Sequence, residues 1–570
     1  MMRASIATLL VLGCAAGCTD NTYMIVTVDK RPAVHEAAKL KVTLSNAGSM
    51  RTDDLDLAGK MFPVTFSLTA PGRGGEIGLS IDALDTNGAL VGRGLGQATL
   101  SDMTAQVILD SADFVVNTDY ANNQFLSSDF EAVGLQLSAT SNGTWTTVFR
   151  DDCSNCDIYG RRFDATGLPV QSQLAAGTNQ FRISTTQTTS GAIPSVSGGL
   201  GTSGLTTLVL WDYFDTVGTG QGVACRALND MGGGTPGQVS TVLSESTDVV
   251  TSAALGNGNF VVTWQNFQSA APAMEVIRSV IVKPDCNPLA SPFTVSQSTQ
   301  SLGHRRSHVA ANGTSLLYVW VADDSVYVRP APNTGTPLGA ERPVITKTST
   351  MSVEHVRVAP YGTGYAIAVR WSAVDGTSPG KIEVYRTDAS GNVQGTPTRI
   401  SDNSGSDFAS DKAFGLATRA DGALLVVWHT CPTGPGSCDV FGRVMRPTGV
   451  PVGPEFMIPT ATGSDQVNPS VVALDSAFVA AWNDSSGLDP DRSGSAVRAR
   501  VLYPPYDDAR AVLGATCGAS APGAPACGPG LACAMGTDQV QRCYETCTPP
   551  ACPNGGTCST IDAATSACTF

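Results

Sequence analysis

Clusters of aspartate in two loops are the residues of this chain whose types could bind a metal. Asp484, Asp489 and Asp491 lie close together with Gly487 and Gly494 between and after them. Asp151, Asp152 and Asp157 form a similar group earlier in the chain. Calcium prefers several hard oxygen ligands, so these loops are candidate calcium sites. The spacing is not that of an EF-hand, and the alternative is that both groups are solvated turns.

Two cysteine pairs lie in loops of the same kind. Cys153 and Cys156 form one pair, and Cys431 and Cys438 form the other. Local disulfides that staple these loops are the simplest explanation. A redox Cys-x-x-Cys motif would need a helix N-terminus, which is not expected here, and a zinc site would need four ligands in a chain with only five His. Cys225 and Cys286 are a further candidate pair.

The C-terminal segment predicts a small module held together by disulfides. Eight of the sixteen cysteines lie in residues 517–570, and six of them form two triplets with the same internal spacing, each preceded by one further cysteine. Such density indicates an oxidising compartment and four disulfides, whose connectivity the sequence leaves open. The eight are Cys517, Cys527, Cys533, Cys543, Cys547, Cys552, Cys558 and Cys568. The stretch Cys552–Cys558 resembles the middle of an EGF-like domain.

The N-terminus predicts export. Arg3 precedes a short apolar core, Ile6–Leu12, and small residues then lead into cysteine. Ala15–Cys18 resembles the lipobox of bacterial lipoproteins, which implies cleavage before Cys18, its lipidation, and a cell-envelope protein anchored to the outer membrane by lipid alone. Cys14 is a competing site, and a plain cleaved signal peptide is the other alternative. Later segments are too short or too polar for a transmembrane helix.

A repeated strand organises the middle of the chain. A tight turn and an alternating apolar strand ending on Trp recur roughly 50 residues apart, which is within the range of propeller blades. The copies are Leu205–Trp211, Gly258–Trp264, Leu316–Trp320, Ala366–Trp371, Leu424–Trp428 and Phe478–Trp482, with Trp145–Phe149 as a degenerate copy that ends on Phe. Each unit has four strand-like pieces, but the last lacks its fourth, which we expect residues 113–118 to supply. The sequence therefore predicts a closed seven-bladed β-propeller.

The whole chain is predicted to be all-β, because 60 Gly and 33 Pro punctuate short alternating strands. Residues 19–112 are expected to form an Ig-like β-sandwich. The predicted boundaries are 1–18 for the lipoprotein signal peptide, 19–112 for the sandwich, 113–505 for the propeller, 506–516 for a linker and 517–570 for the cysteine-rich module.

Two recurring side chains of the propeller are predicted to be structural. The Trp at the end of each second strand is expected to pack between adjacent blades. An Arg recurs in the third strand, as Arg161, Arg226, Arg329 and Arg443, with Arg278, Arg386 and Arg498 nearby. Its regular recurrence favours a repeated salt bridge or a stack on Trp over an anion site.

The function predicted from these features is binding without catalysis. A formal charge of −14 argues against nucleic acid as a partner. The repeat resembles the Trp-containing propellers of bacterial surface proteins. The resemblance rests on Asp421–Trp428, Val440–Arg443 and Gly449–Pro451. That family has no agreed catalytic residues. We expect no enzyme activity, no cofactor beyond calcium, and a glycan, peptide or protein partner at the propeller loops. The alternatives are a glycan-processing propeller enzyme, although Ser138–Trp145 departs from a sialidase Asp-box, and a structural envelope component.

Overall fold

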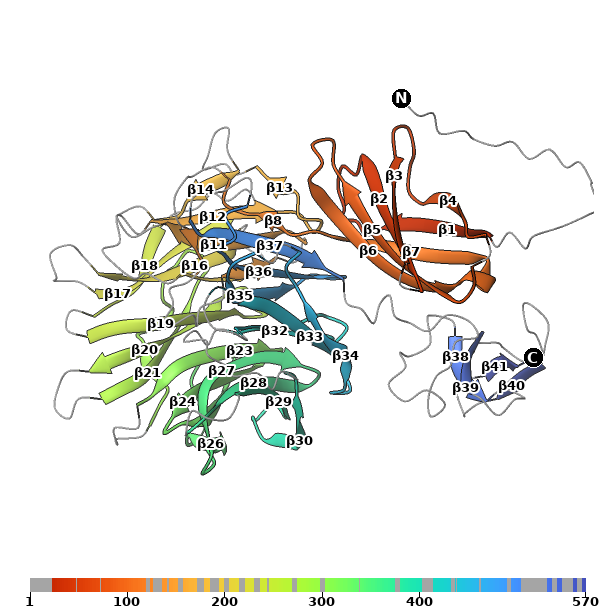
Figure 1. Cartoon of the computed structure of the whole chain (residues 1–570). Coiled ribbons are helices and arrows are strands. Elements are labelled where there is room, and N and C mark those ends of the chain that lie inside the picture. The colour runs from red at the N-terminus through yellow and green to blue at the C-terminus, as the bar shows by residue number, and fades with distance from the viewer. Residues whose placement is uncertain are drawn as a thin grey trace, which may run out of the picture. The chain divides into compact units, whose positions relative to one another are not determined.

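The computed structural model describes residues 23–503, with internal gaps, and four strands between residues 531 and 569. The gaps are 48, 72, 119–123, 127–135, 141–142, 152–156, 172–178, 185–193, 199–204, 215–220, 230–235, 243–244, 269–273, 298–302, 338, 375–379, 402–413, 432–435, 437, 461–462 and 489–493. The chain divides into two compact units, Met1–Ala112 and Asp113–Phe570 (Figure 1). Among the described residues no helix is long and apolar enough to cross a membrane.

The N-terminal unit is a seven-stranded sheet in the order β3-β2-β5-β6-β7-β1-β4. β1 and β7 are parallel, and the other neighbours are antiparallel. Alternate residues of each strand face one core, as Met24, Val26 and Val28 do in the first strand, because side chains of a strand point to opposite faces in turn. The Ig-like class stays a prediction. The elements are β1 (Tyr23–Lys30), β2 (Lys39–Asn46), β3 (Ser49–Asp56), β4 (Val64–Thr69), β5 (Glu76–Leu84), β6 (Leu90–Thr99), η1 (Leu100–Asp102) and β7 (Thr104–Ser111).

Apart from two C-terminal hairpins, the described residues of the second unit form seven antiparallel sheets, the blades of the predicted propeller. Blade 1 comprises β9 (Gln124–Phe125), β10 (Leu137–Ala139), β11 (Trp145–Asp151), β12 (Ile158–Phe163), β13 (Pro169–Val170) and β14 (Gln180–Arg182). Blade 2 comprises β15 (Ser195–Gly198), β16 (Leu205–Phe214), β17 (Gln221–Asn229) and β18 (Pro236–Val242). Blade 3 comprises β19 (Glu245–Ala254), β20 (Phe260–Gln268), β21 (Met274–Val282) and β22 (Phe293–Thr294). Blade 4 comprises β23 (Arg305–Asn312), β24 (Ser315–Ala322), β25 (Ser325–Pro332) and β26 (Arg342–Ile345); blade 5, β27 (Met351–Tyr361), β28 (Gly364–Ala373), β29 (Lys381–Thr387) and β30 (Val393–Arg399). Blade 6 comprises β31 (Phe414–Thr418), β32 (Leu424–Thr430), β33 (Asp439–Met445) and β34 (Pro451–Met457); blade 7, β35 (Gln466–Ala473), β36 (Phe478–Asp484), β37 (Ala496–Leu502) and β8 (Phe114–Val115).

The ring closes as the sequence predicts. The fourth strand of blade 7 comes from the start of the unit, where β8 pairs with β37 through Phe114 opposite Ala499 and Val115 opposite Arg498. In Figure 1 the orange β8 lies beside the blue β37. Arg498 reinforces the junction, since its Nη1 lies 3.1 Å from Asp113 Oδ1 and its Nε 2.8 Å from Asp484 Oδ2. The three side chains are almost fully buried, so this closure is an ion-paired seam inside the fold.

The recurrent Trp residues pack between blades, which confirms the structural prediction. Each belongs to an apolar cluster shared by its own blade and the preceding one. Burying an indole removes roughly 150–250 Å² of surface from water, so these side chains are major contributors to blade stacking. Trp211, Trp264, Trp320, Trp371, Trp428 and Trp482 are all at most 5% exposed.

The recurrent third-strand Arg binds backbone carbonyls of the neighbouring blade. Arg329 Nη1 donates to Val295 O at 2.6 Å and Arg443 Nη1 to Ile400 O at 3.0 Å. Arg226 bonds Ile183 O at 2.9 Å, and Arg161 bonds Val116 O. Arg500 completes the series at Ile458 O, 2.7 Å away. Their role is structural, as the sequence predicts: each of these guanidinium groups joins two blades through a carbonyl, and Arg498 forms salt bridges with Asp113 and Asp484.

The C-terminal strands form two hairpins, β38 (Leu531–Met535) with β39 (Gln541–Glu545) and β40 (Thr557–Thr560) with β41 (Ser566–Thr569). Cys533 lies opposite Cys543 in the first hairpin and Cys558 opposite Cys568 in the second. The equal register agrees with the duplicated spacing of the cysteines. The rest of this segment, with Cys517, Cys527, Cys547 and Cys552, lies outside the described residues, and the EGF-like module stays a prediction.

Candidate functional site

The carboxylate of Asp484, proposed as a calcium ligand, is engaged within the fold. Its Oδ1 accepts a hydrogen bond from Gln466 Nε2 at 3.1 Å, and its Oδ2 is paired with Arg498. Asp489 and Asp491 lie outside the described residues. In the other loop, Asp151 Oδ1 accepts the amide of Asp157, whose own carboxylate pairs with Arg182 at 2.6 Å. No group of three metal-ligating side chains occurs in the described part of the chain, and the calcium site stays a prediction.

Two of the candidate disulfides are formed. Cys431 is bonded to Cys438 within one loop of blade 6, and Cys225 is bonded to Cys286. The second bond links β17 of blade 2 to the segment after β21 of blade 3, so it ties two blades together. Cys153 and Cys156 lie outside the described residues, as do Cys14 and Cys18, so their disulfide and lipidation assignments stay predictions.

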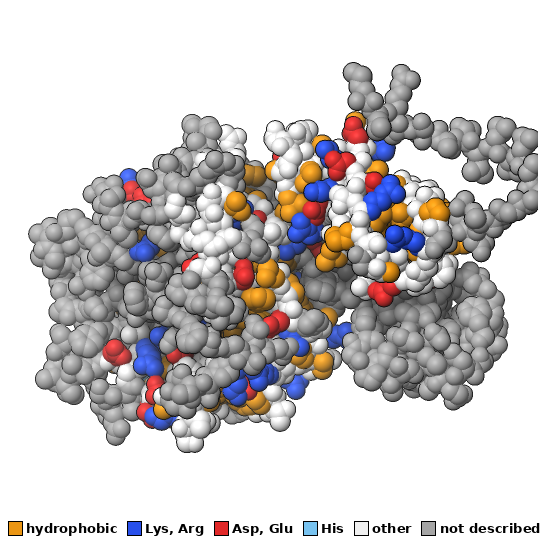
Figure 2. Space-filling model, in the orientation of Figure 1, with side chains coloured by type: hydrophobic (Ala, Val, Ile, Leu, Met, Phe, Trp, Pro, Cys, Tyr) orange, Lys and Arg blue, Asp and Glu red, His pale blue; other side chains and the backbone are white. Residues whose placement is uncertain are grey.

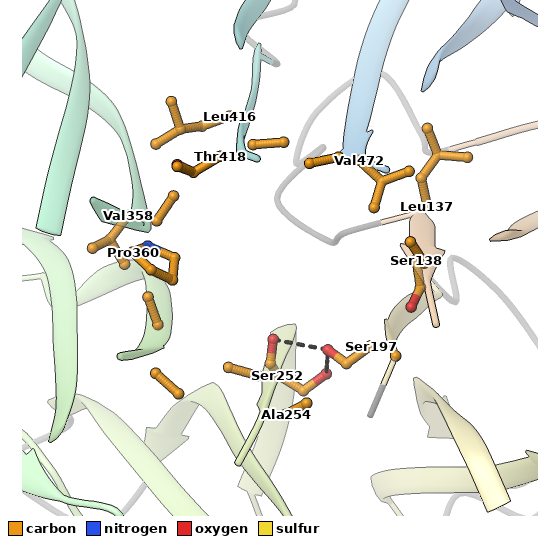
Figure 3. Close-up of a pocket in the computed structure, with 18 of the residues that line it drawn as sticks. Leu137, Ser138, Ser197, Ser252, Ala254, Val358, Pro360, Leu416, Thr418 and Val472 are labelled. Carbon is orange, nitrogen blue, oxygen red and sulfur yellow. Dashed lines mark hydrogen bonds between the residues drawn. The ribbon is translucent and has the colours of Figure 1, made fainter. Parts of the chain in front are cut away.

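The seven inner strands surround a central channel (Figure 3). The described cavity along it measures about 300 Å³ and is lined mainly by small residues. Ser138, Ser197 and Ser252 line one side, and Val358, Leu416 and Val472 face them from the other blades. Adjacent inner strands are so close that a Cβ on Gly198 would lie 1.8 Å from Ala139 O. The channel is thus a narrow passage, and its lining also includes the polar side chains of His308 and Thr418.

We call the end of the channel at which the inner strands begin the mouth. Four inner strands carry a β-bulge near this end. The pairing register shifts in blades 3, 4, 5 and 7, between Asp248 and Thr251, Arg305 and His308, Val353 and His355, and Val467 and Ser470. Arg306 and Asn468 lie within two of these bulges with left-handed backbones, φ 56° and 55°. Bulges re-aim side chains beside active sites, and left-handed non-glycine residues often mark functional positions.

The bulges of blades 4 and 5 bring an arginine cluster together, which we define as Arg306, Arg357, Arg370 and Glu354. Arg306 Nη1 donates to Glu354 O, and Arg370 Nε lies 4.0 Å from Glu354 Oε2. Arg357 donates through Nε to Phe414 O at 3.2 Å and lies over the Phe414 ring. The described cluster thus joins blades 4, 5 and 6 and holds three guanidinium groups with one carboxylate.

Electrostatics within the cluster favours an added negative charge. Burial, and to a smaller extent the Arg306 guanidinium, lowers the pKa of Arg357 to about 9. Arg357 therefore remains charged at neutral pH while it is almost fully buried. Burial, with Arg357 nearby, also holds the pKa of His308 well below 6.5, so this imidazole is neutral at neutral pH. An anion bound at the mouth would offset the mutual repulsion of the guanidinium groups.

Four buried polar side chains near the mouth have no hydrogen-bond partner among the residues that the structure describes. The atoms without a partner are both amide atoms of Asn266 and of Asn468, both ring nitrogens of His308 and the hydroxyl of Ser307. Each residue is at most 3% exposed. Buried polar atoms in proteins are almost always satisfied, so these atoms need an ordered water or a bound polar ligand. We call these four residues the orphaned polar set.

Blade 4 presents the shortest connection at the mouth end among those described. β24 and β25 are joined by Asp323 and Asp324 alone, both with positive φ, as a two-residue hairpin requires. Lys347 Nζ binds Asp323 at 2.7 Å, and Arg305 binds Asp324 at 2.9 Å, which fixes the turn. Arg306 follows Arg305 directly, so the arginine cluster begins beside this tight turn.

No protein-family model matches the sequence, and no curated protein is similar to it. Solved structures are similar at the level of the fold. A protein of unknown function from Dyadobacter fermentans is 10% identical, with a TM-score of 0.40, over 69% of this chain and 98% of its own. An ulvan lyase bound to -[GlcA(1-4)Rha3S]- is 10% identical, with a TM-score of 0.42, over 68% and 96%. A Hadza microbial sialidase is 11% identical, with a TM-score of 0.40, over 85% and 94%.

These comparisons correct the prediction that the chain is not an enzyme. That prediction depended on the absence of known catalytic motifs, but the named proteins of similar fold include a polysaccharide lyase and a sialidase. At about 10% identity the similarity concerns the fold alone, and it transfers no residue to this chain.

The sequence reasoning missed the arginine cluster and the orphaned polar set. It treated each first strand as a small apolar phrase, and the informative residues lie immediately before that phrase. Arg306 and His308 precede Val309, and Glu354 and Arg357 precede Val358. Alignment of the repeats on their apolar phrases would have placed these polar residues at one level of the ring.

Proposed function

We propose that this protein is a glycan-active propeller that binds an acidic glycan at the channel mouth and cleaves it there. The observation that carries this proposal is that the arginine cluster and the orphaned polar set lie at or beside the bulges of the inner strands in blades 3, 4, 5 and 7. Guanidinium groups bind carboxylate and sulfate groups, while buried amide, hydroxyl and imidazole groups bind hydroxyls. An acidic sugar presents both kinds of group.

The same residues supply groups for proton transfer. Glu354 is the carboxylate of the cluster, and His308 is a neutral imidazole on the neighbouring inner strand. Carboxylates and imidazoles are the usual general acids and bases of bond cleavage. In this proposal the arginines hold the anionic substituent, and Glu354 or His308 moves the proton. An exported or envelope location, through the signal peptide and Cys18, remains part of the proposal and fits an extracellular polysaccharide.

Binding is tested with residues 19–570, against uronate-containing, sulfated and neutral polysaccharides in affinity electrophoresis. We expect retardation by the acidic polysaccharides alone, weakening as salt is raised. Arg306→Met should weaken binding about tenfold or more, because it removes a charge-assisted contact. Arg93→Met, which removes a partly exposed arginine of the N-terminal unit that pairs with Asp82, is the matched control. Equal retardation by neutral polysaccharides, or an unchanged Arg306→Met variant, would overturn the binding proposal.

Cleavage is tested separately by following new reducing ends and unsaturated uronate in the same mixtures. We expect slow release of products, and Glu354→Gln should lower turnover with little change in retardation. Unchanged unfolding by urea would show that the variant is folded. Retardation without products from any acidic glycan would leave the binding site in place and overturn the catalytic part.

A further inference from the structure

The N-terminal unit contains a cavity of about 220 Å³ that the proposed function does not use. It lies where β2, β3, β4 and β5 meet the 3₁₀ helix η1. Its apolar lining includes Leu44, Leu68, Ile77 and Leu100, all at most 7% exposed in the structure. An apolar cavity of about 150 Å³ is enough to bind benzene, so this space can hold a ring or a short hydrocarbon chain.

Two arginines line the same cavity. Arg51 is neutralised by Asp53, with Nε 2.8 Å from Asp53 Oδ2. Arg73 differs: in the described part of the chain its guanidinium contacts are with the neutral oxygens of Asn46, at 3.4 and 3.5 Å. These are long hydrogen bonds, so a carboxylate would compete well for the Arg73 guanidinium. Figure 2 shows basic and apolar side chains close together on the visible face of this unit.

We propose that this cavity binds a small amphipathic carboxylate, with its hydrocarbon part on the leucines and isoleucine and its carboxylate on Arg73. Met50, 75% exposed at the rim, is a flexible apolar side chain able to cover the bound tail. The charge at the rim selects an anion, and the apolar lining selects a tail of several carbons. Acetate, without a tail, and an alkylamine, with the opposite charge, should both be rejected.

The experiment is isothermal titration calorimetry on residues 19–570 with octanoate as the probe, and with acetate and octylamine as controls. We expect one octanoate site with a dissociation constant of roughly 0.1–1 mM. Arg73→Gln should weaken it about tenfold, and Leu68→Trp should abolish it by filling the space. Arg93→Gln, an arginine of the same unit that pairs with Asp82 away from the cavity, should leave the affinity unchanged.

The outcomes separate the proposal from non-specific binding. Octylamine bound as well as octanoate, or octanoate affinity unchanged by Arg73→Gln, would overturn it. If Leu68→Trp impairs folding, as its urea midpoint would reveal, Arg73→Gln alone decides the result, because it lies at the rim. Absence of any octanoate heat signal, with the chain folded, would also overturn it.

Discussion

The third-strand arginines show how one repeated side chain can connect a ring. Arg161, Arg226, Arg329, Arg443 and Arg500 each donate to a carbonyl at the end of the preceding blade. A carbonyl at the end of a short fourth strand has no further ladder partner, and a long cationic donor reaches it across the blade interface. Lysine could not replace arginine easily, because Arg329 also donates through Nε to Gly339 O.

Replacing Arg329 by Met should therefore destabilise the propeller by about 2–3 kcal/mol, because a buried carbonyl loses a charge-assisted hydrogen bond. Arg51→Met, at an exposed position, should change stability by less than about 0.5 kcal/mol. Urea unfolding measures both. An Arg329→Met variant as stable as the wild type would show that the repeated contact follows from blade packing and contributes little to it.

His308 predicts a specific pH dependence of stability. Burial holds its folded pKa well below 6.5, so the unfolded chain takes up the proton first as the pH falls. Stability is then fully present above about 6.5 and is lost below it, by at most about 1.4 kcal/mol per pH unit from this residue. His308→Gln should flatten the unfolding free energy between pH 7 and 5, although His304, whose pKa is also lowered, retains its own contribution. An identical slope in the variant would contradict this assignment.

At the scale of elements, the sequence predicts the regular parts of the ring better than its irregular parts. The Trp strands, the short turns and the closing strand follow from alternation and period, because each blade must bury the same two faces. The inner-strand bulges, as at Arg306 and at Asn468, add one residue to the strand and so interrupt its alternation. The local order of apolar and polar residues gives little indication of such a bulge. The site depends on those breaks and on which blades become neighbours, so its members could be found only in the folded ring.

The disulfide between Cys225 and Cys286 is an element-scale staple between blades 2 and 3, with a sequence separation of 61. Replacing both cysteines by Ser should lower the unfolding free energy by about 2–4 kcal/mol, since a closed loop of this length restricts the unfolded chain. Cys431 and Cys438, separated by 7 residues, should contribute less. Thermal unfolding of the two double variants compares them, and a larger loss at the shorter loop would contradict the entropic explanation.

At the scale of the whole molecule, closure depends on Arg498, which is buried between Asp113 and Asp484. Arg498→Met should cost about 3–5 kcal/mol, because it leaves two buried carboxylates without their cation. Limited proteolysis should then cut near residues 113–118 sooner than in the wild type. Protection equal to the wild type would show that the β8 strand is held by its backbone pairing alone.

The pairing of β8 with β37 also dictates when this protein can finish folding. Val497 N donates to Asn117 Oδ1 across 380 residues, so the last edge of the ring stays open until almost the entire propeller has been synthesised. Each growing intermediate presents an unpaired inner face and an unpaired strand edge, the state in which β proteins aggregate. A nascent chain of this kind depends on being kept from other chains until residue 502 has emerged, which makes its assembly an all-or-none event at the end of synthesis.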